Sequence, residues 1–464
     1  MLKSYTDKRN ITIVSMSKQL GIDRATLHKI ISGDRRAPDE KFVADVCRLL
    51  MLSADETERM TELYRISVMG DGVYRRRCTV RDIIKGLSDM SWSKRQDDKM
   101  WTKPVIADIP SVSSVYTSQE LWKRITALLS EEVQKGSEIR MIAQPSEYLS
   151  NILRYAMPSS SSNTLYHMIC LDNSEDLNGS HDYNLGIFPH ICELSSDIKG
   201  YTPVYYYDNA APHLDSMTLL PVLIVTDSFA VCTDDKISRG IIYNEPEAAV
   251  FYRRQFEAMR GNCYPLVISD NSLDSLFLKA CRYPKNTTII HYQPSFFYAL
   301  SDEEVLDNCN YFKCGKPEKI TELMGKIRRS FIGRGQTELF CEDGLREFME
   351  TGIVYEFPRD FFKSIDEKKR KAFLKKMIEM TEKGLYDYRI VRKDHGVSGR
   401  LRINCLGGTD VRLMMRSDDF DNVVYVQTDE QSLVHAFGDY IDHLLEDGMV
   451  LSSRETIKIM KSYL

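Results

Sequence analysis

Small and cationic side chains gather between residues 24 and 36, in a pattern suited to contacting nucleic acid. The segment from Arg24 to Lys29 supplies hydrogen-bond donors and small side chains that can reach base edges and phosphates. Arg35 and Arg36 follow as a basic pair. The residues predicted to contact double-stranded DNA are Thr12, Arg24, Ala25, Thr26, His28, Lys29, Arg35 and Arg36.

Two short helices joined by a tight turn would position these side chains. Thr12 and Asp23 are residue types that cap a helix N-terminus, and Gly21 and Gly33 can end a helix in the left-handed conformation. The second helix would then turn its polar face outward. Apolar residues at helical spacing provide the buried faces of the two helices: Met16, Leu20, Leu27, Ile30 and Ile31.

The stretch from Ile11 to Arg36 resembles the helix-turn-helix of phage-repressor or XRE-type transcriptional regulators. The resemblance implies an all-α domain over residues 1–69 that binds DNA as a homodimer. This chain has Ile13 where the family often has a phosphate-contacting glutamine, so the predicted contacts fall on residues 24–29 and 35–36. A small helical bundle without a DNA-binding role is the alternative. The positions that carry the resemblance are Thr12, Met16, Ser17, Leu20, Gly21, Ile22, Asp23 and Gly33.

Length and charge indicate a basic N-terminal region joined to a larger acidic region. The chain has 464 residues, too many for one ordinary core, and a net charge of −5. Residues 1–100 hold 20 Lys and Arg against 15 Asp and Glu, a balance of +5, so the remaining residues carry −10. This asymmetry fits a DNA-binding domain attached to a region that does not bind DNA.

The cysteines and the hydropathy pattern indicate the compartment. The 11 cysteines include no Cys-x-x-Cys pair, so we expect free thiols, no metal site and a cytoplasmic location. No apolar run is long enough to span a membrane, and the charged N-terminus does not resemble a signal peptide. Gly407 and Gly408 are not followed by the Lys-Ser/Thr of a phosphate loop, and no cofactor is expected.

The chain changes character twice after the N-terminal helices. Residues 70–116 are expected to be a linker with one short helix from Val80 to Met90, and the arginines between Arg75 and Arg81 are expected to be solvated. The alternative is that these arginines form an arm that contacts phosphates. From residue 117 helices and strands alternate, which predicts an α/β domain over residues 117–260. We expect helices at 118–135, 147–156, 183–194 and 246–259. We expect strands at 138–143, 165–171, 202–207, 220–226, 229–233 and 240–243.

This domain resembles the phospholipase-D-like sensor domain of some TrmB-type regulators, which implies a mixed sheet. The segments that carry the resemblance are VLIVTDSFAVCTDD and GIIYNEPEAAVFYRRQFEAM. Catalysis in that fold needs His-x-Lys, which places the nucleophile and a phosphate-binding cation on one strand face. None of the nine histidines has lysine two positions later. We therefore predict no catalytic residues and no enzymatic activity.

Residues 261–464 are expected to form a second α/β region. Its segment VVYVQTDEQSLVHAFGDYIDHL again predicts a strand followed by a helix. This region could therefore be either a divergent copy of the first domain or an unrelated fold. We expect strands at 286–292, 352–356, 386–392, 400–405, 411–415 and 422–427. We expect helices at 301–308, 358–384, 429–446 and 453–463.

Four residues of the first α/β domain are candidates for a ligand site. Arg140 and Gln144 lie where a strand leads into a helix N-terminus, a geometry that favours an anion. Tyr205 and Tyr207 share one face of a strand and could stack on a ligand ring. The alternatives are a surface arginine beside a capped helix and a pair of half-buried sheet tyrosines.

These patterns predict a sequence-specific transcriptional regulator. Its C-terminal α/β region would sense an unidentified small molecule or protein effector and support a homodimer. One alternative is a hydrolase or nuclease of phospholipase-D-like fold targeted by the N-terminal domain, although the missing His-x-Lys argues against it. The other is a protein-interaction module in which the N-terminal helices dock a protein and not DNA.

Overall fold

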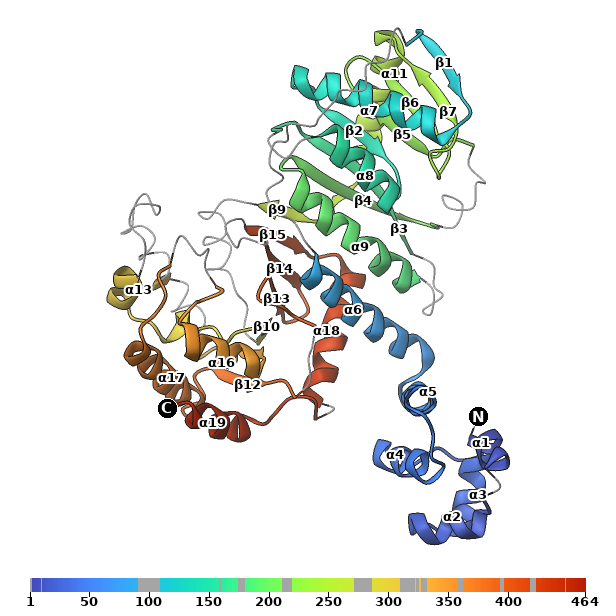
Figure 1. Ribbon diagram of the computed structural model, residues 1–464. Coiled ribbons are helices and arrows are strands. Elements are labelled where there is room, and N and C mark those ends of the chain that lie inside the picture. The colour runs from blue at the N-terminus through green and yellow to red at the C-terminus, as the bar shows by residue number, and fades with distance from the viewer. Residues whose placement is uncertain are drawn as a thin grey trace. The chain divides into compact units, whose positions relative to one another are not determined.

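The chain has a mixed α/β, multidomain fold, shown by a computed structural model (Figure 1). Two compact units are present: the first ends at Cys78 and the second begins at Thr79. No helix in the described ranges is both long and apolar enough to cross a membrane. The structure describes residues 2–9, 11–90, 109–157, 161–173, 180–210, 219–270, 286–308, 322, 325–326, 332–356, 362–392, 396–417, 423–446 and 448–464.

The first unit is built from short helices around a small core. Met16, Leu27 and Val46 are at most 2% exposed and pack together with Leu50. Each of the four later helices begins at a side-chain cap, since Thr12, Asp23, Asp39 and Ser53 accept hydrogen bonds from backbone amides of the first turn. The helices are α1 (Leu2–Lys8), α2 (Ile13–Leu20), α3 (Arg24–Ser32), α4 (Glu40–Leu49) and α5 (Ala54–Met69).

Helix α6 (Asp71–Asp89) covers much of the predicted linker. It begins well before Val80, where the short helix was expected. Gly70 separates it from α5 with a φ of +89°, and the ion pair between Arg75 and Asp71, 2.9 Å long, supports its first turn. Arg75 and Arg81 are exposed on this helix, whereas Arg76 and Arg77 are half-buried. Its apolar stripe packs into the core of the second unit through Val80, Ile83, Ile84 and Leu87. Residues 91–108 of the predicted linker lie outside the described ranges.

The first sheet has eight strands in the order β1-β7-β6-β5-β2-β3-β4-β8. β2, β3 and β4 pair in parallel, and the remaining neighbours pair antiparallel. Helices α7 (Ser118–Lys135), α8 (Glu147–Ala156), α9 (Ser180–Asp197) and α11 (Pro246–Arg260) accompany it. The strands are β1 (Val112–Val115), β2 (Ile139–Ile142), β3 (Leu165–Asp172), β4 (Tyr201–Asp208), β5 (Val222–Val225), β6 (Ala230–Thr233), β7 (Gly240–Tyr243) and β8 (Tyr264–Pro265).

The second sheet has seven strands in the order β12-β11-β10-β13-β14-β15-β9. Its helices are α13 (Asp302–Asn308), α16 (Glu342–Thr351), α17 (Glu367–Glu382), α18 (Gln431–Glu446) and α19 (Ser453–Ser462), with a 3₁₀ turn at Phe297–Ala299. The strands are β9 (Ile268–Asp270), β10 (Thr287–His291), β11 (Thr337–Phe340), β12 (Asp387–Ile390), β13 (Leu401–Leu406), β14 (Asp410–Arg416) and β15 (Val423–Thr428).

Six strands of each sheet share one order and one sense of pairing. The first sheet contains β7-β6-β5-β2-β3-β4, and the second contains β15-β14-β13-β10-β11-β12. In both, three strands pair in parallel and the next strand returns antiparallel to the first of them. In both, a helix follows the last strand of the set, α11 after β7 and α18 after β15.

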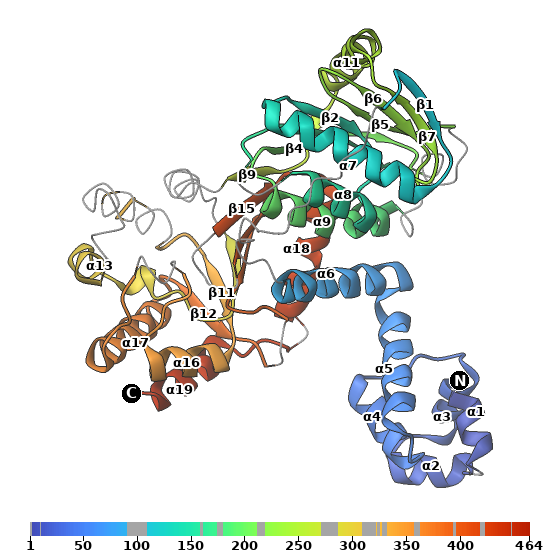
Figure 2. The same cartoon turned by 45° about the horizontal axis from the view of Figure 1, so that its top comes forward.

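The two sheets share one hydrophobic core within the second unit. The core includes Leu171 of β3 and Val426 of β15. α9 lies against α18 (Figure 2), where the rings of Phe188 and Phe437 meet edge to face with centroids 6.0 Å apart. The Asn184 amide nitrogen of α9 donates to the Ser432 hydroxyl of α18 over 3.2 Å. α9 and α18 therefore join the two α/β regions.

The predicted strand at 352–356 is not a strand. Gly352, with a φ of +70°, ends α16 in the left-handed conformation. The backbone that follows pairs with a side chain: the Tyr355 N–H donates to Gln293 Oε1 over 3.0 Å, and Gln293 Nε2 donates to the Ile353 carbonyl over 3.1 Å. The helix expected at 358–384 is α17, which begins later, at an Asp366 cap. Residues 357–361 lie outside the described ranges.

Candidate nucleic-acid interface and ligand-site residues

Helices α2 and α3 are joined by a turn whose residues are fixed by hydrogen bonds. Gly21 adopts a φ of +64° at the end of α2, where a side chain would be strained. Asp23 Oδ2 accepts from the Thr26 N–H over 3.0 Å at the start of α3. These amide hydrogen bonds lower the pKa of the Asp23 carboxyl. Because a carboxylate already occupies the amides of this helix end, DNA contacts here would come from side chains.

The exposed face of α3 carries most of the predicted DNA contacts. Leu27 and Ile30 are buried on the opposite face. The side chains of Arg24, Ala25, His28 and Lys29 are exposed, as are Arg35 and Arg36 beyond the helix, whereas Thr26 is half-buried.

The loop after α3 lies against this face. Arg35 Nη1 donates to the Thr26 hydroxyl over 3.5 Å, and the Arg35 N–H donates to the Lys29 carbonyl over 3.0 Å. The structure therefore places Arg35 beside Thr26 and Lys29. Thr12 is exposed at the start of α2, where its hydroxyl oxygen accepts from the Ser15 N–H over 3.2 Å.

The four predicted ligand residues do not form one site. Arg140 is 8% exposed and forms ion pairs of 2.6 Å with Glu138 and with Glu257 of α11. Two carboxylates therefore already surround the guanidinium that was predicted to bind an anion. Gln144 Oε1 accepts a hydrogen bond of 2.7 Å from the Tyr183 hydroxyl of α9.

The two tyrosines lie on the other face of the first sheet. In the register of the parallel strands, Arg140 pairs with Tyr166 and Tyr166 pairs with Thr202, so these residues lie on the same face of the sheet. Alternate residues of a strand point to opposite faces. Tyr205 and Tyr207 therefore face away from Arg140. Their rings meet edge to face with centroids 5.3 Å apart. The Tyr207 hydroxyl donates to Glu430 over 2.5 Å.

Glu430 itself caps helix α18 and is fully buried. Its carboxylate accepts from the Ser432 and Leu433 backbone amides over 3.0 and 2.9 Å. Tyr207 thus links β4 to the N-terminus of α18. Tyr207 is 44% exposed, and this contact gives its hydroxyl a partner within the protein.

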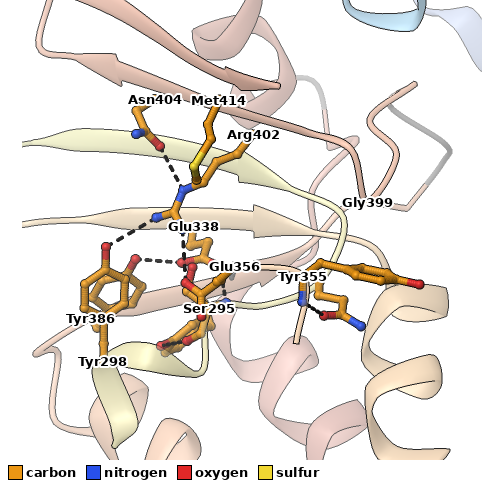
Figure 3. A network of polar contacts seen from close by, with 12 residues as sticks. Ser295, Tyr298, Glu338, Tyr355, Glu356, Tyr386, Gly399, Arg402, Asn404 and Met414 are labelled. Carbon is orange, nitrogen blue, oxygen red and sulfur yellow. Dashed lines mark hydrogen bonds and ion pairs between the residues drawn. The ribbon is translucent and has the colours of Figure 1, made fainter. Parts of the chain in front are cut away.

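A buried polar network in the second sheet was not predicted (Figure 3). Arg402 of β13 pairs with Glu356 over 3.0 Å and donates to Asn404 Oδ1 and the Tyr298 hydroxyl over 3.2 and 3.3 Å. Beside it, Glu338 of β11 accepts from the Ser295 N–H and from the Tyr386 hydroxyl, over 2.5 and 2.6 Å. Arg402 and Asn404 alternate with apolar residues in LRINCL, which is a signal for a polar face on this strand.

Glu338 should make the stability of the second unit depend on pH. Burial raises the pKa of its carboxyl from 4.5 to about 7, although Arg402 acts to lower it. Because the folded pKa is raised, the contribution to stability is full below the unfolded pKa and is lost as the pH rises through the folded value. In the Glu338→Gln variant, the free energy of unfolding, measured by urea denaturation, is expected to fall less steeply between pH 4.5 and about pH 7 than in the wild type. An equally steep fall in the variant would contradict this assignment.

The described ranges hold no group of three or more His, Cys, Asp or Glu side chains placed to bind a metal ion. The cysteines within them are free thiols, of which Cys78, Cys263 and Cys341 are partly exposed.

Comparisons with known proteins yield weakly similar solved structures and no family. No protein-family model matches the chain, and no curated protein matches it. Similar solved structures include the phosphatidylserine synthase of Haemophilus influenzae Rd KW20, which is 12% identical and covers 85% of this chain and 97% of its own, with a TM-score of 0.25. They also include TrmBL2, an archaeal chromatin protein with a novel mode of DNA binding, 13% identical over 43% of this chain and 62% of its own, with a TM-score of 0.21.

The first of these structures corrects one prediction. The chain was predicted not to be an enzyme because it lacks His-x-Lys. A structure that matches 85% of the chain is that of an enzyme, a phosphatidylserine synthase, so this exclusion is wrong. The missing spacing concerns one catalytic motif only, and a TM-score of 0.25 assigns no reaction to this chain.

Proposed function

We propose that this chain is a sequence-specific DNA-binding transcriptional regulator with an XRE-type helix-turn-helix formed by α2 and α3. The observation that carries the proposal is the exposed face of α3. Arg24, His28 and Lys29 are exposed opposite the buried Leu27 and Ile30, at the spacing with which a helix presents one face to a major groove. Arg35, held against Thr26, extends this surface toward the DNA backbone.

The α/β region would receive the signal in this proposal. We propose that the second unit is a sensor of phospholipase-D-like type built from two divergent copies of one fold, because six strands of each sheet share one order and sense of pairing. It would bind a small-molecule or protein effector and hold the protein as a homodimer. The two N-terminal domains of such a dimer would contact two half-sites on DNA.

The test is an electrophoretic mobility-shift titration of the full chain on duplex DNA from its own promoter region. The wild type is expected to shift the duplex, and an Arg24→Ala/Lys29→Ala variant to shift it only at much higher protein concentration. Equal behaviour of the two proteins would overturn the assignment of α3 as the DNA-contacting helix.

A further inference from the structure

A cavity of about 740 Å³ lies in the second unit at the ends of three parallel strands. Tyr292, Cys341 and Val391 line it, and each directly follows a strand, β10, β11 and β12 respectively. The carboxyl edge of parallel strands is where open α/β sheets bind their ligands. The cavity is also lined by Lys85 and Asp89 of α6 and by the segment from Gly396 to Ser398.

The charges that line this cavity are balanced in sign. The cations are Lys85, Arg346 and Arg392, and the carboxylates are Asp89, Glu342 and Asp343. A ligand with charges of one sign would meet three like charges here. A molecule that carries one charge of each sign would avoid that repulsion.

Only part of this charge is neutralised by the protein itself. Arg346 pairs with Asp343, and Arg392 pairs with Glu455 over 3.0 Å. Lys85 and Asp89 are exposed, and neither forms an ion pair, with the other or with a third group, within the described ranges. They are one helical turn apart, so their Cβ atoms are separated by about 5–6 Å. Because they form no ion pair, both charges are available to a ligand.

We propose that the cavity binds a zwitterion of dipeptide size, with its carboxylate against Lys85 and its ammonium against Asp89. The charged ends of a free α-amino acid are closer together than the Cβ atoms of Lys85 and Asp89, whereas the ends of a dipeptide span several ångströms. The volume of about 740 Å³ also leaves room for two ligand side chains beside Tyr292.

The cavity is built partly on the helix that leads to the first unit. The Ser398 N–H donates to Ser88 Oγ over 3.2 Å, and Ser398 Oγ donates to the Ser88 carbonyl over 3.0 Å. Gly396, with a φ of +76°, approaches so closely that a Cβ there would lie 3.3 Å from the Lys85 Cβ. A ligand that bridges α6 and the strand ends therefore acts on a helix that continues to Asp71.

This placement couples the ligand to DNA binding, a step that rests on the proposed function. Bound dipeptide would change the conformational free energy of α6, and the part of this helix from Asp71 to Cys78 belongs to the first unit. Such couplings are typically 5- to 150-fold in affinity, and we expect about fivefold or more. Binding of DNA must then change the affinity for dipeptide by the same factor.

The binding step is tested by calorimetry of the full chain with dipeptides of the common amino acids, one at a time. At least one is expected to bind, and to bind about tenfold more weakly when its amine is acetylated or its carboxylate is amidated, since each change removes a charge-assisted hydrogen bond. Lys85→Gln should weaken the free dipeptide but not the amide. Asp89→Asn should weaken the free dipeptide but not the acetylated form.

The control is Arg81→Gln, a change on an exposed residue of the same helix that does not line the cavity. It is expected to bind the dipeptide as the wild type does. The proposal is overturned if no dipeptide binds, or if Lys85→Gln and Asp89→Asn bind dipeptide with wild-type affinity.

The coupling step is tested by repeating the DNA titration with and without the dipeptide. A change of about fivefold or more supports it. Dipeptide binding with unchanged DNA affinity overturns the coupling while leaving the ligand site in place. If the chain binds no DNA at all, the proposed function fails, and the calorimetry still decides on the ligand site.

Discussion

Replacing Arg402 with methionine is expected to lower the free energy of unfolding of the second unit by about 3–5 kcal/mol. The side chains of Arg402 and Glu356 are 7% and 5% exposed, so the change leaves a buried carboxylate without its main partner. It also leaves the Tyr298 hydroxyl and Asn404 Oδ1 without the donors that the guanidinium supplies. Urea unfolding followed by circular dichroism measures the loss.

A matched double variant separates a lost charge partner from lost packing. In Arg402→Met/Glu356→Leu both charges are removed together, and apolar replacement of a buried ion pair is often neutral or stabilising. The double variant is therefore expected to recover most of the stability that the single variant loses. A cost below about 1 kcal/mol for Arg402→Met, the range of an exposed ion pair, would show that the network is not buried as described.

The Arg24→Ala/Lys29→Ala variant is expected to bind its DNA site about thirtyfold more weakly, or worse. A side-chain contact to a base or phosphate contributes about 1–3 kcal/mol, and 1.4 kcal/mol corresponds to a factor of ten in affinity. Both side chains are exposed on α3, so their loss leaves its buried face unchanged. Equilibrium titration at one fixed salt concentration is required, because phosphate contacts make the affinity depend on salt.

The control for this prediction is Lys41→Ala/Arg48→Ala, which removes two positive charges from exposed positions on α4. This variant is expected to bind DNA within about threefold of the wild type, since it changes the net charge equally but touches no predicted contact. A loss as large as that of the α3 variant would show that total charge, and not the face of α3, determines binding.

Elements with local signals could be predicted from the sequence. α7 was expected at 118–135 and lies at Ser118–Lys135, because a Thr117 cap begins it and Gly136 ends it in the left-handed conformation. α3 was expected between Asp23 and Gly33 for the same reasons. Caps and helix-ending glycines act within a few residues, so they can be read without knowledge of the fold.

Contacts between distant segments could not be predicted in the same way. Arg140 was expected to face an anionic ligand, but its partner Glu257 is 117 positions away in the sequence. Arg402 and Glu356 come together only because Arg402 lies on β13, a strand paired with β10. The short strands β8 and β9 were also missed, since two or three residues give no measurable periodicity.

The most direct test of the proposed function is selection of binding sites from a random duplex library by the full chain. The account predicts enrichment of a near-palindromic sequence with half-sites about one helical turn apart, as expected for a homodimer that places two copies of α3 in successive major grooves. The Arg24→Ala/Lys29→Ala variant, selected in parallel, should enrich no such sequence. Failure of the wild-type chain to enrich any sequence over the starting library would contradict the account.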